Sequence, residues 1–341
     1  MADRLPAAFA EQAANCAALG SPFMERLMRH LAAHWPDDTA LAQHFAAWPG
    51  EIGPRGASLP LRLASGLHAL VLSGQNAELA AAYPGGSGGN LAAAVDRALH
   101  RHDAFLARWC DRAPQTNEIR RSAALIAVAH WLTARHGLPI TLSELGASAG
   151  LNLMFDRYAL EIGGHCFGPA NAVLQLVPEW QGSLPPVAKP VITDRRGVDL
   201  APLRAGRPED ELRLLSCLWP DQAERLARTR AALKVQSAMV DQADAVDWLE
   251  QRLATPRPGQ LHLIYHTIAW QYFPAEAQAR GSRLLEAAGT RATADAPVAW
   301  FGMEADDSAE GAGLRLRLWP DHLDMAIGRA GFHGQWIHWQ G

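Results

Sequence analysis

The sequence predicts an α/β fold, in which a Rossmann-like, mostly parallel sheet follows an all-helical N-terminal domain. Up to about residue 135, apolar residues recur at spacings of three and four, as in "SPFMERLMRHLAAHW", and this periodicity is typical of helices. From Pro139 onward, short β-rich runs alternate with helical segments, as expected for a parallel sheet covered by helices. Because 341 residues is long for one core, we expect two domains, 1–135 and 136–341.

The expected order of elements after Pro139 is specific enough to test. We expect an antiparallel pair of strands, "GLRLRLWP" and "GQWIHW", to close the sheet at the C-terminus, joined by a loop and a short helix. An insert at about 159–189 is predicted to form a small hairpin and a loop. The predicted strands are 140–145, 190–194, 235–240, 261–266 and 297–303, and the predicted helices are 149–158, 220–233, 245–254 and 274–288.

The composition limits the partners and the location. The net charge is −4 and no basic block is long enough to follow a phosphate backbone, so we expect a small-molecule substrate and no nucleic acid. The four cysteines are scattered without a C-x-x-C pair, which favours a reducing cytosol. The N-terminus carries charges throughout and no apolar run approaches the ~20 residues of a membrane span. We therefore expect a cytoplasmic protein that does not enter a membrane.

The stretch "SELGASAGLN" fits two incompatible patterns. As G-x-S-x-G it is a candidate nucleophile elbow of a serine hydrolase, with Ser148 as nucleophile and Asp295 and His333 as possible partners. An elbow needs several strands before it, and here nearly 140 helical residues precede it. In the second pattern, a strand ends at Glu144 and is followed by a loop that contains Gly146 and Gly150. Such a loop is a candidate binding site for a nucleotide-like cofactor such as S-adenosylmethionine.

The order of the following acidic residues favours the cofactor interpretation. "RRGVDLAPL" predicts a second strand that ends at Asp199, where an acid accepts hydrogen bonds from ribose hydroxyls. Asp244 follows the third predicted strand and is placed to meet an adenine amino group. The side of the cofactor that carries methionine and ribose is assigned to Glu144, Gly146, Ser148 and Gly150. Asn152 is a candidate cofactor contact or a polar residue at the start of the helix.

The segment after the fourth predicted strand, "HTIAWQYFP", carries the candidate catalytic residues. Methyl transfer is an in-line displacement in which the enzyme mainly positions the nucleophile. His266 is a candidate base with an ordinary pKa near neutrality, and Tyr272 is the second candidate catalytic residue. Trp270 and Gln271 are candidate substrate contacts, and an aromatic ring there can attract the sulfonium. Two histidine pairs at helical or strand spacing lack a third ligand, so we expect no metal.

Several motifs together resemble the bacterial family called domain of unknown function 2332. They are "PQTNEIRRSAAL", "SELGASAGLNLMFDRY", "RRGVDLAPL", "LWPDQAERL", "HTIAWQYFP" and "LRLWPD…HGQWIHW", and they span almost the whole chain. The resemblance implies a class I methyltransferase-like fold and S-adenosylmethionine as the cofactor, and it implies no particular substrate. One departure from the methyltransferase pattern is Ser148, which stands where a glycine is common.

The resemblance also gives roles to the polar cluster that starts at Asn117. It implies that Asn117 and Arg120 hold the methionine carboxylate or the substrate, with Glu118 beside the substrate. The helical domain is then expected to act as a lid that selects the substrate. The sequence leaves open a second class of function, a protein that binds the cofactor or a partner without catalysis, and the serine hydrolase remains a third hypothesis.

Overall fold

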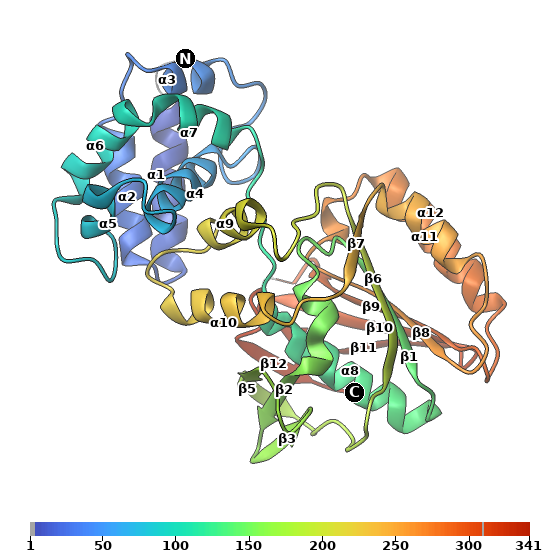
Figure 1. Cartoon of the computed structure of the whole chain (residues 1–341). Coiled ribbons are helices and arrows are strands. Elements are labelled where there is room, and N and C mark those ends of the chain that lie inside the picture. The colour runs from blue at the N-terminus through green and yellow to red at the C-terminus, as the bar shows by residue number, and fades with distance from the viewer. Residues whose placement is uncertain (1–3, 309) are drawn as a thin grey trace. The chain divides into compact units, whose positions relative to one another are not determined.

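The computed structural model describes residues 4–308 and 310–341, and the chain forms two compact units (Figure 1). Unit 1 contains the described residues up to Thr116 together with Gly206–Arg230. Unit 2 contains Asn117–Ala205 and Ala231–Gly341. No helix within the described ranges is both long and apolar enough to cross a membrane.

Unit 1 is helical, and its helices start where the sequence provides caps. The side chains of Ser21, Thr39, Asn76 and Asn90 each accept a backbone amide at a helix start, which satisfies a donor that the helix leaves free. The helices are α1 Arg4–Ala18, α2 Pro22–Ala33, α3 Ala40–Ala46, α4 Leu59–Leu72, α5 Ala77–Ala82, α6 Leu91–Arg101, α7 Asp103–Cys110 and α9 Pro208–Ser216, and α10 Ala223–Leu233 runs from unit 1 into unit 2.

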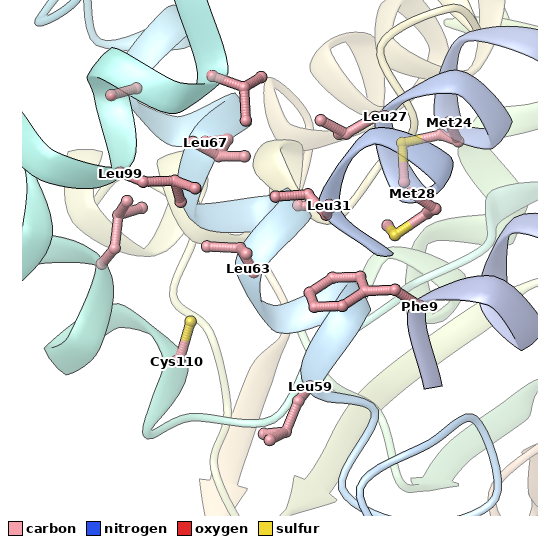
Figure 2. Close-up of a cluster of buried hydrophobic side chains, with 14 of the residues drawn as sticks. Phe9, Met24, Leu27, Met28, Leu31, Leu59, Leu63, Leu67, Leu99 and Cys110 are labelled. Atoms are coloured by element: carbon pink, nitrogen blue, oxygen red, sulfur yellow. The ribbon is translucent and has the colours of Figure 1, made fainter. Parts of the chain in front are cut away.

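A single apolar core holds unit 1 together (Figure 2). Phe9 from α1, Leu27 and Leu31 from α2, and Leu63 and Leu67 from α4 are fully buried in it. Because burial of one such side chain contributes about 1.5–3 kcal/mol, the shared apolar face of these three helices accounts for their packing.

The excursion 206–230 is tied to unit 1 by polar contacts. The Asp221 carboxylate accepts hydrogen bonds from Ser21 Oγ at 2.7 Å and from the Phe23 amide at 3.1 Å, at the start of α2. The Arg213 guanidinium lies 4.0 Å from the centre of the Trp109 ring. His68 Nδ1 donates to the carbonyl of Leu218 at 3.0 Å. These contacts explain why the chain returns to unit 1 after part of unit 2 has been completed.

The boundary between the units differs from the expected one near residue 135. Helix α8, Ser122–His136, belongs to unit 2. It is buried almost throughout its first eleven residues, because it packs against later segments of the same unit, which include η2 Leu151–Arg157 and β2 Tyr158–Ile162. An apolar helix that is covered on several sides has no single amphipathic face to show which unit it joins.

Unit 2 is built on a nine-stranded sheet with the order β5-β12-β11-β10-β9-β8-β1-β6-β7. The five strands from β7 to β9 are mutually parallel, β10 to β12 continue as an antiparallel meander, and β5 pairs with β12 in parallel. The strands are β1 Ile140–Leu145, β5 Glu179–Gly182, β6 Ile192–Asp199, β7 Met239–Gln242, β8 Leu261–Thr267, β9 Val298–Ala305, β10 Ala312–Trp319, β11 Leu323–Ala330 and β12 Trp336–Trp339.

Helices cover the central strands, which are buried along their whole length. Helices α11 Ala245–Leu253 and α12 Ala275–Thr290 contribute Leu249 and Leu285 to a core that also contains Ile264 of β8. Helix α8 lies on the other side of the strands (Figure 1). Such double covering is the usual environment of parallel strands. The predicted α/β class with a mostly parallel sheet is confirmed.

The structure corrects the expected C-terminus and insert. The segment expected to form a short helix between "GLRLRLWP" and "GQWIHW" is the strand β11, which pairs with both neighbours, so those two strands do not pair with each other. In the insert, β2 Tyr158–Ile162, β3 His165–Phe167 and β4 Leu174–Leu176 form a separate small sheet, and β5 returns to the edge of the large one. The sequence "LDMAIGRA" of β11 has no clean alternation, which is why its strand was missed.

Acid should destabilise unit 1 through His68. Burial lowers the pKa of His68 from its ordinary 6.5 to about 4, against the opposing effect of its hydrogen bonds to the carbonyls of Ser216 and Leu218. Unfolding restores the ordinary value, so the stabilisation is present above pH 6.5 and is lost as the pH falls toward 4. We expect this group to account for at most about 3 kcal/mol of lost unfolding free energy.

Urea titrations at pH 7, 6, 5 and 4.5 measure this loss. His68→Gln should flatten the acid dependence, whereas His34→Gln, which changes an exposed histidine, should leave it as in the unmodified protein. Equal acid dependence in all three proteins would contradict the assignment to His68.

Candidate functional site

The order of the strands reverses at β1 and β8. From β1 the sheet continues to β6 on one side and to β8 on the other. In open α/β sheets, ligands bind outside the carboxyl ends of the strands at such a point. The segments at this edge are the loop 146–150 after β1, the end of β6 and the loop 268–272 after β8. The segment 117–121 joins them through hydrogen bonds with Thr267 and Leu151.

The glycines of loop 146–150 are required by contacts within the protein. Gly146 has φ +70°, and a Cβ there would lie 2.5 Å from the Cβ of Ala269 in the loop after β8. Gly150 has φ +69°, and a Cβ there would lie 2.5 Å from Gln236 Nε2. The two loops at the reversal point therefore touch each other, and close approach of a ligand is not needed to explain either glycine.

Most amides of this loop are already used. The amides of Gly146 and Ala147 both donate to the carbonyl of Val198, and the amide of Gly150 donates to that of Ala147. The carbonyl oxygen of Gly146 accepts no hydrogen bond from the residues that the structure describes. The loop thus offers a ligand a hydrogen-bond acceptor, the Gly146 carbonyl. The sequence had instead suggested that backbone amides of this region donate to the ligand. The helix expected at 149–158 is instead the irregular 3-10 segment η2, Leu151–Arg157.

Ser148 combines backbone strain with an unused hydroxyl. Its φ is +52°, which is uncommon for a residue other than glycine. The side chain is 6% exposed, and Oγ makes no hydrogen bond within the described part of the chain. An unsatisfied buried hydroxyl costs about 1–3 kcal/mol. A serine nucleophile needs a base within hydrogen-bond reach, and this hydroxyl has none, so the geometry does not support the hydrolase hypothesis.

Asp199 lies where the sequence predicted it, at the end of β6, but it supports the loop. One carboxylate oxygen accepts the amide of Ser148 at 2.8 Å, and the other accepts the amide of Ala201 at 2.9 Å. A strand-end acid thus fixes the strained residue of the neighbouring loop.

Two asparagines join the segment 117–121 and helix α8 to the region after the loop. Asn117 Oδ1 accepts the amide of Leu151 at 2.8 Å, and Asn152 Oδ1 accepts the hydroxyl of Ser122 at 2.7 Å. Both side chains are at least 95% buried. Their amide nitrogens make no hydrogen bond with any described residue, so two donors remain available beside Ser148.

Glu118 and Arg121 hold the segment 117–121 in place. Glu118 accepts the amide of Arg120 at the start of η1, Ile119–Arg121. Arg121 donates to the carbonyl of Thr267 at the end of β8 and to that of Phe332, each at 3.0 Å. Arg121 therefore fixes the segment over the carboxyl edge of the sheet. This role was not predicted, because every residue has a backbone carbonyl and the sequence does not show which one an arginine binds.

Glu144 is a buried carboxyl at the end of β1. It is 1% exposed, and the hydroxyl of Tyr265 on β8 lies 3.4 Å from its Oε2. Burial raises the pKa of Glu144 well above the ordinary 4.5, against the effect of the Tyr265 hydrogen bond. The pairing register places Tyr265 directly opposite Glu144, a relation that the sequence does not reveal.

The structure argues against His266 as a base. Its Nε2 accepts the indole N–H of Trp300 at 2.9 Å, and because that group only donates, Nε2 carries no proton. Nδ1 then donates to the Glu304 carboxylate at 2.7 Å. Both nitrogens are used and the ring is 3% exposed, so His266 is a hydrogen-bonded residue at the end of a strand.

Glu304, at the end of β9, organises the loop after β8. Besides His266 it accepts the amides of Ala269, Trp270 and Gln271 at 3.0–3.3 Å. Burial raises the pKa of Glu304, but the hydrogen bond from His266 and those from the amides of Ala269 and Trp270 lower it below the ordinary value. No role was predicted for Glu304, because the loop that it binds lies more than thirty residues away in the sequence.

The other predicted residues after β8 and β7 also have structural partners. The Trp270 ring stacks on His266 and packs against Gly281 of α12. Gln271 Oε1 accepts the amide of Ala305. Asp244 caps α11 by accepting two amides. Tyr272 is 74% exposed, and Asp244 is also exposed.

The fold and this edge define an α/β protein with a candidate ligand site at the point where its strand order reverses. The chain belongs to the family of domain of unknown function 2332, described as an uncharacterized protein conserved in bacteria, whose model matches residues 6–339. Searches found no similar protein among those with curated descriptions and no similar solved structure.

The contact between the two loops can be measured by substitution. Gly146→Ala should destabilise the protein through both the positive φ and the clash with Ala269. Gly137→Ala is a matched control, because Gly137 has φ +66° and open space around its Cβ position. We expect Gly146→Ala to cost about 1–3 kcal/mol more unfolding free energy than Gly137→Ala.

The double variant Gly146→Ala/Ala269→Gly should recover most of that difference in urea unfolding. If the two single glycine variants are equally stable, or the double variant shows no recovery, the loops are not in contact as described.

Proposed function

We propose that the carboxyl edge around β1 binds S-adenosylmethionine and that the protein transfers its methyl group to a small molecule. The observation that carries the proposal is a glycine-containing loop after the first strand, at the reversal point, surrounded by polar groups without partners. In doubly wound folds, this is the place where nucleotide-like cofactors bind. Membership of the family of domain of unknown function 2332 fixes no reaction, so the proposal depends on the site.

The unused groups match an amino acid moiety. The Gly146 carbonyl and the Glu144 carboxyl can accept hydrogen bonds from the methionine ammonium. Ser148 Oγ, Asn117 Nδ2 and Asn152 Nδ2 can donate to its carboxylate or to ribose oxygens. Asp199 lies at the end of β6, where it accepts the amides of Ser148 and Ala201 and where acids of doubly wound folds accept hydrogen bonds from ribose hydroxyls. A ligand that engages Ser148 also removes the cost of its unsatisfied hydroxyl.

The engagement of His266 restricts the proposed acceptor. With both of its nitrogens used, this residue takes no proton from a substrate. We therefore propose an acceptor that is nucleophilic without help, such as a carboxylate, a thiolate or a neutral amine. The enzyme then acts mainly by holding the acceptor in line with the methyl group.

The same observation favours a second candidate, a protein that binds the cofactor without catalysis. His266, predicted as a catalytic residue, and Gln271, predicted as a substrate contact, are used to hold the loop after β8. In this case S-adenosylmethionine binds and no methyl group is transferred. Calorimetry together with a turnover assay across thiols, amines and carboxylic acids separates the two candidates.

Binding is tested by titrating S-adenosylmethionine and S-adenosylhomocysteine into the unmodified protein, Asn117→Asp and Asn90→Asp. Asn117→Asp keeps the acceptor for Leu151 and replaces the free amide donor by a negative oxygen, so the affinity should fall at least about tenfold. Asn90→Asp is the matched control, because Asn90 Oδ1 also accepts a backbone amide but in unit 1. Its affinity should stay within about twofold of the unmodified protein.

Ser148→Ala should weaken binding only about two- to tenfold, the effect of one neutral hydrogen bond, and should leave turnover detectable. Failure of the unmodified protein to bind either compound would exclude the cofactor. Labelling of Ser148 by a fluorophosphonate would instead revive the serine hydrolase.

Glu144 should release a proton when the cofactor binds. Because burial raises its pKa, a larger fraction of this carboxyl is protonated near neutral pH than for an exposed glutamate. A methionine ammonium beside it favours the ionised form and lowers that pKa. Calorimetry at pH 6.5 in PIPES and in Tris should therefore give different binding enthalpies, and Glu144→Gln should remove the difference. Buffer-independent enthalpies in the unmodified protein would place the ammonium elsewhere.

A further inference from the structure

A cavity of unit 2 lies away from the reversal point. Its volume is about 530 Å³, and it lies between β6, β7, α11 and the segment that follows α11. Its charged lining residues are Arg196 of β6, Asp241 of β7, Arg252 of α11 and Arg257 of the following segment. None of its lining residues belongs to the loop 146–150, the segment 117–121 or the loop 268–272. The volume is in the range of small-molecule sites, about 300–1,000 Å³.

Two of the three arginines are held in place by carboxylates. Arg196 binds Asp241 through Nε at 2.6 Å and Nη2 at 2.9 Å. Arg252 binds Asp194 through Nη2 at 2.9 Å and Ser143 Oγ through Nε at 3.1 Å. In both guanidinium groups, Nη1 makes no hydrogen bond with the described residues. These pairs fix the arginines and leave a donor group on each.

Arg257 has no such partner. Its guanidinium makes no ion pair or hydrogen bond with any residue in the described ranges, and its Nε is buried. Burial, and next the positive charge of Arg252, lower the pKa of Arg257, with Asp194 acting in the opposite direction. A half-buried cation beside another cation is unfavourable unless an anion balances it.

The charges of this cavity are therefore unbalanced. Three guanidinium groups face two carboxylates, Asp194 and Asp241, and the excess is positive. Guanidinium groups recognise phosphate through several N–H donors in a plane. Ala243, Trp248 and Pro256 supply the apolar part of the wall.

We propose that this cavity is a second ligand site, which binds the phosphate group of a small phosphorylated molecule against Arg257, with Arg196 and Arg252 as neighbouring donors. The site is separate from the proposed cofactor edge, so a phosphorylated substrate or effector can occupy it whether or not S-adenosylmethionine binds.

The test uses the full chain and two probes, inorganic phosphate and glycerol phosphate, against sodium chloride at matched ionic strength. Proton–nitrogen spectra of the arginine side chains report on the site directly. We expect both probes to shift the Arg257 Nε–H signal in a saturable way. Arg257→Gln should weaken binding of phosphate at least about tenfold in calorimetry.

Arg283→Gln is the matched control, because Arg283 is an exposed arginine of α12 outside the lining, and its affinity for phosphate should stay within about twofold. Arg257→Gln should be as stable to urea as the unmodified protein without phosphate, since it removes an unpaired cation. The proposal is overturned if neither probe shifts the signal, if chloride gives the same shift, or if Arg257→Gln binds phosphate as well as Arg283→Gln does.

Discussion

The candidate site depends on two carboxylates that hold its two loops. Asp199 at the end of β6 accepts the amide of Ser148 in the loop after β1. Glu304 at the end of β9 accepts three consecutive amides of the loop after β8. Each acid thus lies on the strand next to the one that the loop follows, β6 beside β1 and β9 beside β8. Hydrogen bonds to ionised groups are stronger than neutral ones, and they keep the loops in contact through Gly146 and Ala269.

This support explains which residues remain available to a ligand. His266, which the sequence predicts to be catalytic, instead helps to hold the end of β8 in place. Its two ring nitrogens form hydrogen bonds with Glu304 and Trp300. The groups left without partners lie on the other loop and beside it, at Ser148, Asn117 and Asn152. A ligand site at this edge is therefore centred on the loop after β1. Its available groups can form hydrogen bonds with a ligand, whereas the candidate base, His266, is already engaged.

Polar groups outside this edge are also held by partners in both units. In unit 1, Asp221 caps α2, and His68 stays neutral against the carbonyls of Ser216 and Leu218. In unit 2, Arg196 and Arg252 are neutralised by the neighbouring aspartates, and Arg257 is not. A buried polar group without a partner is costly, and Ser148 and Arg257 are two of several described residues with a buried polar atom that makes no hydrogen bond; these two lie at the proposed sites.

Periodicity and local turn residues in the sequence determined the helices of the first part, the α/β class, and the strands β1, β8 and β9, because these depend on neighbours within a few residues. The sequence also placed Glu144, Gly146, Ser148 and Asp199 at one edge, since parallel strands share their carboxyl ends. Only the tertiary structure decided that α8 joins unit 2, that 206–230 returns to unit 1 and that β11 is a strand. It also decided that His266 is bound by Glu304 and Trp300, because such partners lie far apart in the chain and meet only when the sheet forms.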